Sequence, residues 1–393
     1  MRTYKNNKLT TVIFITLILA VSTPQVFALP PDPDNAALLY YQAFLLYPQA
    51  DDTTRDLLRN LSQGKIDPND KITEYVESCH ASLELAMVAS EIPMCNWGVR
   101  FSEGFAMNLP FLAQARSLYF LMTADARILA GEGAYRDALS RCLAAKRMGQ
   151  HMGDNIIISV LVAISIDTGA NNCIRDFLVS MPADVETLQW LKTQLATVPT
   201  RALSINHAMK LEQEVVLRTL QIDNIDMLVK TLKDAGIGVT DEMLEAVDEM
   251  YLEKCREHYA NHMSAIQNVL SAPMTYAKKY SELKKLDDRV QSEKEENTNA
   301  VLTAFLAPAT AKAYNVSVRA NALNNATRTA VDIYILKAKT GKLPDVIPAD
   351  SPKDPFSGQD FGYEKTKEGF ILRCQAEDLD KNEIHQYEFK VKK

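Results

Sequence analysis

The feature that most constrains the fold is the stretch Leu112–Leu178, in which three segments of helical periodicity follow one another. The first segment ends at Gly131-Glu132-Gly133, where two glycines break the pattern. One face of the second segment carries mostly small side chains: Ala138, Cys142, Ala145, Gly149 and Met152. Because small side chains let a neighbouring helix approach closely, the pattern predicts helical hairpins packed as a bundle or solenoid.

The rest of the chain predicts a mainly α-helical fold that ends in a small antiparallel sheet. A content of 14 Gly and 16 Pro in 393 residues is low for a β-rich protein. Helical periods cover residues 72–92, 200–233, 241–270 and 300–338, the last broken at Pro308. Short alternating runs then predict three strands: Phe361–Lys365, Gly369–Cys374 and Tyr387–Lys392. We therefore expect a helical body over residues 29–338 and a β-rich region over 339–393, packed on the helix 300–338.

Residues 1–28 have the pattern of a signal peptide. A basic start without acids precedes Leu9–Ser22, an apolar run too short to span a membrane comfortably. Val26-Phe27-Ala28 then suits cleavage after Ala28. The pattern predicts an exported protein, periplasmic or extracellular, with no stable membrane span after cleavage. An uncleaved N-terminal anchor is the alternative.

The charge balance bears on the class of partner. The chain has 43 Lys and Arg against 50 Asp and Glu, a net charge of −7 at pH 7. Cleavage of the leader would remove three basic residues and no acidic ones. An acidic balance of this size disfavours nucleic acid or an anionic membrane as the main partner. The densely charged residues 276–300 mix acids with bases, which is typical of a solvated helix face.

The chain contains six cysteines at wide, irregular spacings: Cys79, Cys95, Cys142, Cys173, Cys255 and Cys374. An even number in an exported protein permits disulfides, and Cys79–Cys95 and Cys142–Cys173 are the two candidate pairs. The alternative is that the cysteines are small buried apolar residues.

Ala126–Met148 resembles a hairpin of the tetratricopeptide (TPR) type. Gly133, Tyr135, Ala138 and Ala145 follow the small and aromatic pattern of that repeat. No clean second copy recurs at the expected period, so an array is not indicated. The resemblance implies a pair of stacked helices of the kind that builds protein-binding surfaces.

Asn321–Cys374 resembles the globular end of the major pseudopilin of type II secretion systems. In that family a helix leads into a Gly-Pro loop, an Asp-Pro-aromatic-x-Gly turn and a short sheet. The corresponding segments here are Gly341–Pro344, Asp354–Gly358 and the strands that follow. A pseudopilin carries its helix at its mature N-terminus, so the resemblance implies the small fold and not filament assembly. Taken together, the chain looks like exported bacterial proteins of unknown function that join TPR-like hairpins to such an end.

The pseudopilin resemblance also implies a Ca²⁺ site in the loop after the sheet begins. There Asp378, Asp380 and Asn382 stand at alternate positions and offer the oxygen ligands that Ca²⁺ prefers. The loop departs from the EF-hand pattern, because Glu383 stands where Gly is required and Phe389 where a bidentate Glu belongs. An acidic surface turn without metal is the alternative.

A second candidate metal site consists of Cys255, His258 and His262, which share one face of a predicted helix at spacings i, i+3 and i+7. Thiolate and imidazole ligands suit Zn²⁺ and would make the protein a metal-dependent hydrolase. The sequence offers no evident fourth ligand and no HExxH pattern. A partly exposed helix face is the alternative.

No catalytic residue or cofactor is assigned from the sequence. It contains no GxSxG, P-loop or GxGxxG motif, and we interpret paired acids such as Glu212 and Glu214 as surface charge. The sequence therefore favours an exported, non-enzymatic helical scaffold that binds a protein partner in the cell envelope. The alternatives are a secretion-system component that docks through residues 340–393, and the metal-dependent hydrolase.

Overall fold

The computed structural model describes residues 32–153, 156–199, 203–221, 229–230, 233 and 248–391, without the side chains of Phe105 and Ala106. Asn35–Lys393 forms one compact unit. The predicted signal peptide lies outside the described residues. The unit is mainly helical with a small three-stranded antiparallel sheet near its C-terminus, which confirms the predicted fold class.

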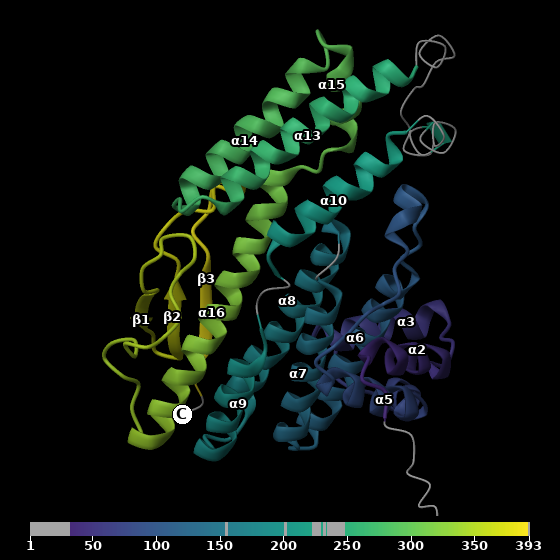
Figure 1. Cartoon of the computed structure of the whole chain (residues 1–393). Coiled ribbons are helices and arrows are strands. Elements are labelled where there is room, and N and C mark those ends of the chain that lie inside the picture. The colour runs from purple at the N-terminus through teal and green to yellow at the C-terminus, as the bar shows by residue number, and fades with distance from the viewer. Residues whose placement is uncertain are drawn as a thin grey trace, which may run out of the picture. The chain divides into compact units, whose positions relative to one another are not determined.

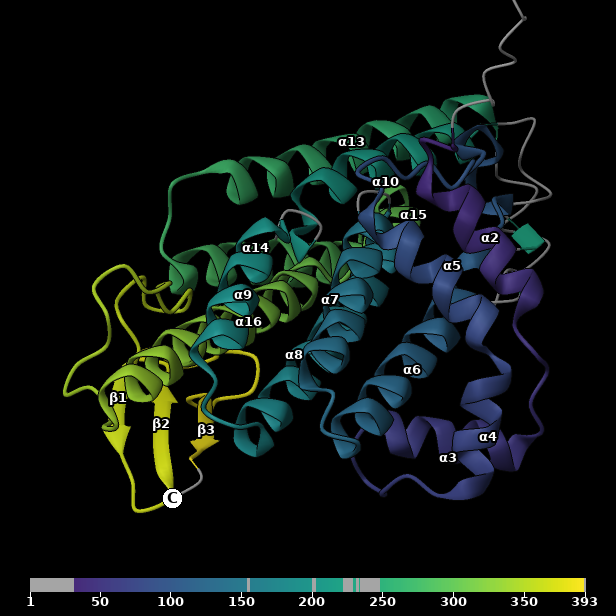
Figure 2. The ribbon, with the colours of Figure 1, turned by 90° about the horizontal axis from the view of Figure 1, so that it is seen from below.

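Three helices occupy the stretch that organises the sequence pattern: α6 (Pro110–Gly131), α7 (Tyr135–Met152) and α8 (Ile157–Ser180). They lie side by side, and Gly133, with φ +85°, forms the turn between α6 and α7 (Figures 1 and 2). The small-residue face of α7 is buried. A Cβ atom added at Gly149 would lie 3.3 Å from the carbonyl oxygen of Ala163 on α8. The predicted close approach of neighbouring helices is therefore confirmed.

The described residues form two hydrophobic cores, and α7 and α8 contribute side chains to both. Besides these two helices, the first core is built by α2 (Ala36–Leu46), α3 (Asp52–Ser62), α4 (Asp70–Ser78), α5 (His80–Glu91) and α6. The second is built by α9 (Val185–Thr197), α10 (Ile205–Thr219), α13 (Glu249–Ser271), α14 (Tyr276–Glu293), α15 (Thr298–Leu306), α16 (Thr310–Thr340) and the sheet. On α7, for example, Leu143 faces the second core and Met148 the first. The α7–α8 pair thus lies between the two cores and packs against both.

Local chemistry explains most helix boundaries. Asn69 caps α4 by accepting the N–H of Ile72 at 3.2 Å. The prediction of one helix over residues 72–92 was wrong in one respect. The helix breaks at Cys79, whose N–H donates to the carbonyl of Val76 in a tight 3₁₀-type turn. A 3₁₀ helix, η1 (Phe101–Ala106), then precedes α6. The predicted break at Pro308 separates α15 from α16.

The two remaining predicted helices are described only in part. The period over residues 200–233 corresponds to α10, but one helix over this whole range was wrong, because α10 ends at Thr219 and Leu220 and Gln221 are not helical. The period over 241–270 corresponds to α13, which begins at Glu249 with Asp248 as its N-cap. Other residues of these periods lie outside the described chain.

The sheet consists of β1 (Gly362–Lys365), β2 (Gly369–Arg373) and β3 (Gln386–Lys390) in that order, close to the predicted strands. Phe370 stands opposite Phe389 across the β2–β3 pair. One face of the sheet packs on helices, because the ring of Tyr334 on α16 lies 5.6 Å from that of Phe370. The guanidinium of Arg175 on α8 lies 5.2 Å from the ring centre of Phe389. Figure 1 shows the strands beside α16.

Among the described residues, α8 is the one helix long and apolar enough to cross a membrane. In its most apolar window 61% of the residues are buried inside the protein. It also carries the buried polar residues Asp167 and Asn171. These properties are typical of the central helix of a packed core.

All six cysteines are described as free thiols. Cys142 on α7 and Cys173 on α8 do face each other, and burial raises the pKa of the Cys142 thiol. Cys79 instead lies against Tyr75, and Cys95 against the backbone of Ala37. The structure therefore places one candidate pair in contact and gives the other two cysteines separate surroundings.

Candidate functional site

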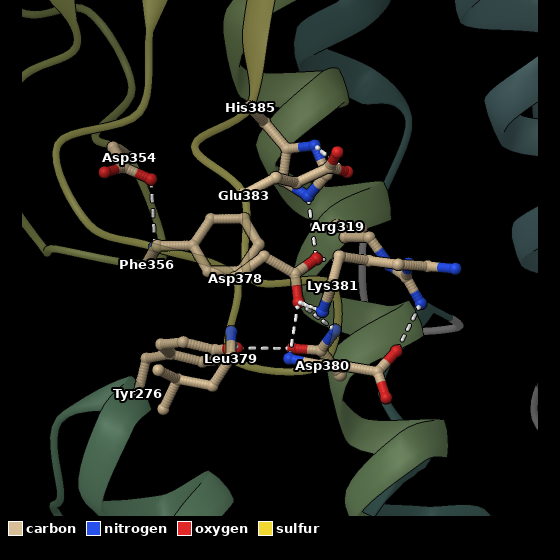
Figure 3. Close-up of polar contacts among 11 residues, drawn as sticks. Tyr276, Arg319, Asp354, Phe356, Asp378, Leu379, Asp380, Lys381, Glu383 and His385 are labelled. Carbon is tan, nitrogen blue, oxygen red and sulfur yellow. Dashed lines mark hydrogen bonds and ion pairs between the residues drawn. The ribbon is translucent and has the colours of Figure 1, made fainter.

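The predicted Ca²⁺ loop, between β2 and β3, is organised around the carboxylate of Asp378, which is fully buried (Figure 3). Its Oδ1 atom accepts hydrogen bonds from the side-chain amide of Asn315 at 2.6 Å and from the backbone N–H of Asp380 at 3.0 Å. Asn315 in turn accepts the hydroxyl proton of Tyr276 at 2.5 Å. The same Tyr276 hydroxyl accepts the N–H of Leu379 at 2.9 Å. This chain of bonds fixes the loop to α14 and α16.

The second oxygen of Asp378 faces groups that carry or can carry positive charge. Oδ2 lies 2.7 Å from Nε2 of His385 and 3.6 Å from Nε of Arg319. Arg319 also reaches Asp380, with an N–O distance of 3.4 Å. Burial by itself would raise the pKa of Asp378, but the hydrogen bonds from His385, Asn315 and the loop backbone hold that pKa below its usual value. Asp378 is therefore a charged, compensated carboxylate.

These contacts bear on the predicted Ca²⁺ ligands Asp378, Asp380 and Asn382. Ca²⁺ takes about six to eight oxygen ligands, whereas the groups around Asp378 are mainly nitrogen donors. Asn382 adopts a left-handed backbone with φ +52°, which suits a tight turn. Among the described residues, no group of three or more His, Cys, Asp and Glu is placed to hold a metal ion. The geometry favours the hydrogen-bonded turn, and Ca²⁺ binding stays a prediction.

Replacing Asp378 distinguishes the two interpretations. We expect Asp378→Asn to lower the free energy of unfolding by about 2–3 kcal/mol, because buried donors lose their charged acceptor. Asp345→Asn, at an exposed acid that pairs with Lys365, should leave the free energy of unfolding unchanged within the error of the measurement. Urea titrations with and without added Ca²⁺ measure both effects. Stabilisation of the wild type by Ca²⁺ that disappears in Asp378→Asn would establish a metal site instead.

The segment Asp354–Gly358 forms a tight corner, closed by the N–H of Gly358 donating to the carbonyl of Asp354 at 2.7 Å. Asp354 is fully buried and accepts the N–H of Phe356 at 2.9 Å and the N–H of Gln375 at 2.8 Å. Gly358 has φ +74°, a conformation that glycine adopts without strain. The ring of Phe356 packs edge-on against Tyr276, with ring centres 4.8 Å apart. The corner and the Asp378 loop thus share Tyr276 as a support.

The predicted Zn²⁺ ligands lie on α13 but have different partners. Cys255 is fully buried and in hydrogen-bond contact with Tyr251. His258 contacts Thr303 Oγ1 through Nδ1 at 2.8 Å and Glu293 Oε2 through Nε2 at 3.2 Å.

The third predicted Zn²⁺ ligand, His262, has a buried Nε2 atom without a hydrogen-bond partner among the described residues. Burial lowers the pKa of this histidine to about 4. The contacts of His258 tie α13 to α14 and α15, and they do not assemble the three predicted ligands around one point. Zn²⁺ binding stays a prediction.

The outer face of α2 is a candidate site that the sequence reasoning missed. Ala36, Ala37, Tyr40 and Ala43 of this helix are buried. On the other side, three leucines are exposed: Leu38 by 51%, Leu45 by 85% and Leu46 by 54%. The signal was present in the sequence, because AALLYYQAFLL places apolar residues on both faces of one short helix, and a single core covers only one face.

A pocket of about 430 Å³ lies at the C-terminal end of the same helix, where Phe44 of α2 and the residues that follow it meet α3 and α6. Phe44, Tyr47 and Phe120 contribute aromatic walls, and Arg55 and Arg59 of α3 also line it. The guanidinium of Arg59 lies 5.9 Å from the ring centre of Phe120. The exposed leucines Leu38, Leu45 and Leu46 together with this pocket are called the α2 surface below.

Comparison with known proteins gives no relative: no family model, no curated protein and no solved structure matches the chain. The TPR and pseudopilin resemblances therefore rest on their own residues and stay predictions. Conclusions about function rest on the geometry of the chain itself.

Proposed function

We propose that the chain is an exported, non-enzymatic helical scaffold that binds a protein partner in the cell envelope through the α2 surface. The observation that carries the proposal is the exposure of Leu38, Leu45 and Leu46 on one short helix beside an aromatic-lined pocket. Single exposed apolar residues are common on soluble proteins, whereas a group of them next to a pocket is typical of a protein-binding surface.

The chemistry of the α2 surface indicates what the partner presents. An apolar side chain entering the pocket would contact Phe44, Tyr47 and Phe120. A carboxylate beside it would compete with Asp52 and Asp56 for Arg55 and Arg59, whose side chains are 62% and 52% exposed. We therefore expect the partner to offer an apolar anchor next to an acidic residue.

The underside of α2 supports this role because it is held rigidly. The ring of Tyr40 stacks on Trp97 with ring centres 5.4 Å apart, and Trp97 stacks on Phe111 at 4.6 Å. The indole of Trp97 donates to the carbonyl of His151 at 2.8 Å. A helix fixed in this way presents its outer leucines with little loss of entropy on binding.

Charge substitutions on α2 test the proposal. We expect the double change Leu45→Glu/Leu46→Glu to weaken partner binding at least about tenfold, because charged groups would replace the apolar contact. The thermal midpoint should stay unchanged, because both side chains are exposed. The matched control is Val346→Glu, which adds a charge at a residue that is 74% exposed in the C-terminal region.

Quantitative co-purification from envelope extracts of cells that carry each variant provides the measurement. Loss of the partner in the α2 variant and its retention in Val346→Glu is the expected result. The reverse pattern would contradict the proposal and would favour docking through residues 340–393.

A further inference from the structure

The helices α7 and α8 pack closely against each other and run antiparallel. A Cβ atom added at Gly149 would lie 3.3 Å from the carbonyl oxygen of Ala163. Earlier on α7, the ammonium of Lys146 donates to Asp167 at 2.6 Å and to Asn171 at 3.0 Å, and both of these residues come later on α8. Positions that come earlier on α7 therefore meet positions that come later on α8. These contacts define the register of the interface.

This register brings two cysteines together. Cys142 lies one helical turn before Lys146 on α7, and Cys173 lies two residues after Asn171 on α8. The two positions are at the same level of the interface, and the thiols face each other. Both side chains are fully buried, and the structure describes both as free thiols. A disulfide needs Cα atoms roughly 4.4–6.8 Å apart, and the small side chains around Cys142 let the two helices approach closely.

The other four cysteines have hydrogen-bond neighbours that are not cysteines: Tyr75 for Cys79, the backbone of Ala37 for Cys95, Tyr251 for Cys255, and Asp354 and Tyr387 for Cys374. The structure describes all six cysteines, and it places one pair of them in contact.

The chemistry of the pair indicates when it can react. Thiol–disulfide exchange requires a thiolate that an oxidant can reach. Burial raises the pKa of the Cys142 thiol and also covers it in the folded protein. An oxidant therefore has to reach the pair before the core closes around it.

We propose that Cys142 and Cys173 form a disulfide that ties α7 to α8, made by exchange with a disulfide oxidant of the cell envelope while the chain folds. The inference rests on the export in the proposed function for its oxidant, and on the α7–α8 register for its pairing. One thiolate attacks the oxidant's disulfide and forms a mixed disulfide, and the other thiolate then displaces the oxidant. Two electrons and two protons pass from the cysteines to the oxidant's disulfide, which is reduced to two thiols.

Oxidative refolding of the full chain tests the pairing without any need for export. The purified, reduced chain is refolded in a buffer of reduced and oxidised glutathione, unfolded in the presence of an alkylating agent, and digested with trypsin. We expect four of the six cysteines to be alkylated. We also expect Cys142–Lys146 to be joined to Met148–Arg175, with a mass about 2 Da below that of the two reduced peptides together. Six alkylated cysteines, or a link between other cysteines in place of this one, would overturn the proposal.

Urea denaturation of the wild type and two variants separates the disulfide from packing effects. The disulfide restricts the unfolded chain, so the wild type should have a higher urea midpoint when oxidised than when reduced. Cys142→Ser should lose the linked peptides and show the same midpoint in both states. Cys95→Ser, at a partly exposed cysteine, should keep the linked peptides and the higher oxidised midpoint. A wild-type midpoint that does not rise on oxidation would contradict the link between the helices.

Protein recovered from producing cells, with its thiols trapped by acid, separates failure of this inference from failure of the proposed function. The expected result is the same pair of linked peptides in the trapped protein. Linked peptides after refolding but not in cells would overturn the claim that the chain meets an oxidant as it folds. No linked peptides in either sample would overturn the pairing itself and leave binding through the α2 surface untouched.

Discussion

Lys146→Met should lower the free energy of unfolding by about 3–5 kcal/mol, because it leaves a buried carboxylate without its cation. The Lys146 side chain is 1% exposed. Its ammonium donates to Asp167 at 2.6 Å, Asn171 at 3.0 Å and Asn324 at 3.2 Å. The network joins α7 and α8, which lie between the cores, to α16. Loss of the network therefore affects the packing of α16 and the second core against α7 and α8.

Urea denaturation with a double-mutant cycle measures the effect. We expect Lys146→Met/Asp167→Leu to recover most of the loss, because a buried ion pair replaced by apolar groups of similar volume leaves no uncompensated charge. Lys284→Met is the control, because Lys284 pairs with Asp288 at the surface and its loss should leave the free energy of unfolding unchanged within the error of the measurement. Equal stability of the Lys146→Met variant and the wild type would show that the network does not hold the helices together.

Acidification from pH 6.5 to about 4 should destabilise the fold steeply. Burial lowers the pKa of His151 and of His262 to about 4, below the usual histidine value of about 6.5. Between these pH values the unfolded chain binds more protons than the folded chain, so stability falls as pH falls and is fully present above pH 6.5. Each histidine contributes a slope of up to about 1.4 kcal/mol per pH unit.

Denaturation curves at pH 7.0, 5.5 and 4.5 for the wild type and His→Gln variants isolate these contributions. His151→Gln should reduce the dependence of stability on pH by the uptake of about one proton on unfolding. The ring of His151 contacts the Tyr40 hydroxyl at 3.1 Å. A wild-type stability that does not vary across this range would contradict the account of the buried rings.

Local sequence patterns predicted the elements of this fold well, because their signals are local. The small-residue face of α7, the break at Pro308 and the alternating strands depend on residues a few positions apart. The break at Cys79 was missed because it depends on one tightened turn within a continuous helical pattern.

The polar sites were not predictable in the same way, because their partners are far apart in the sequence. Asn315 lies 63 residues from Asp378, and Asn324 lies 178 residues from Lys146. The interpretation of Glu212 as surface charge was wrong. Its carboxylate accepts the N–H of Ile157 at 3.2 Å at the start of α8, and burial raises the pKa of Glu212. No periodicity in the sequence encodes these pairings.

Site-specific photo-cross-linking in the envelope of producing cells tests the central claim most directly. A photoreactive residue at position 45, on the outer face of α2, should give one saturable adduct with a partner protein, and the same probe at position 346 should give none. An adduct from position 346 alone, or identical adduct patterns from both positions, would contradict a scaffold that binds its partner through α2.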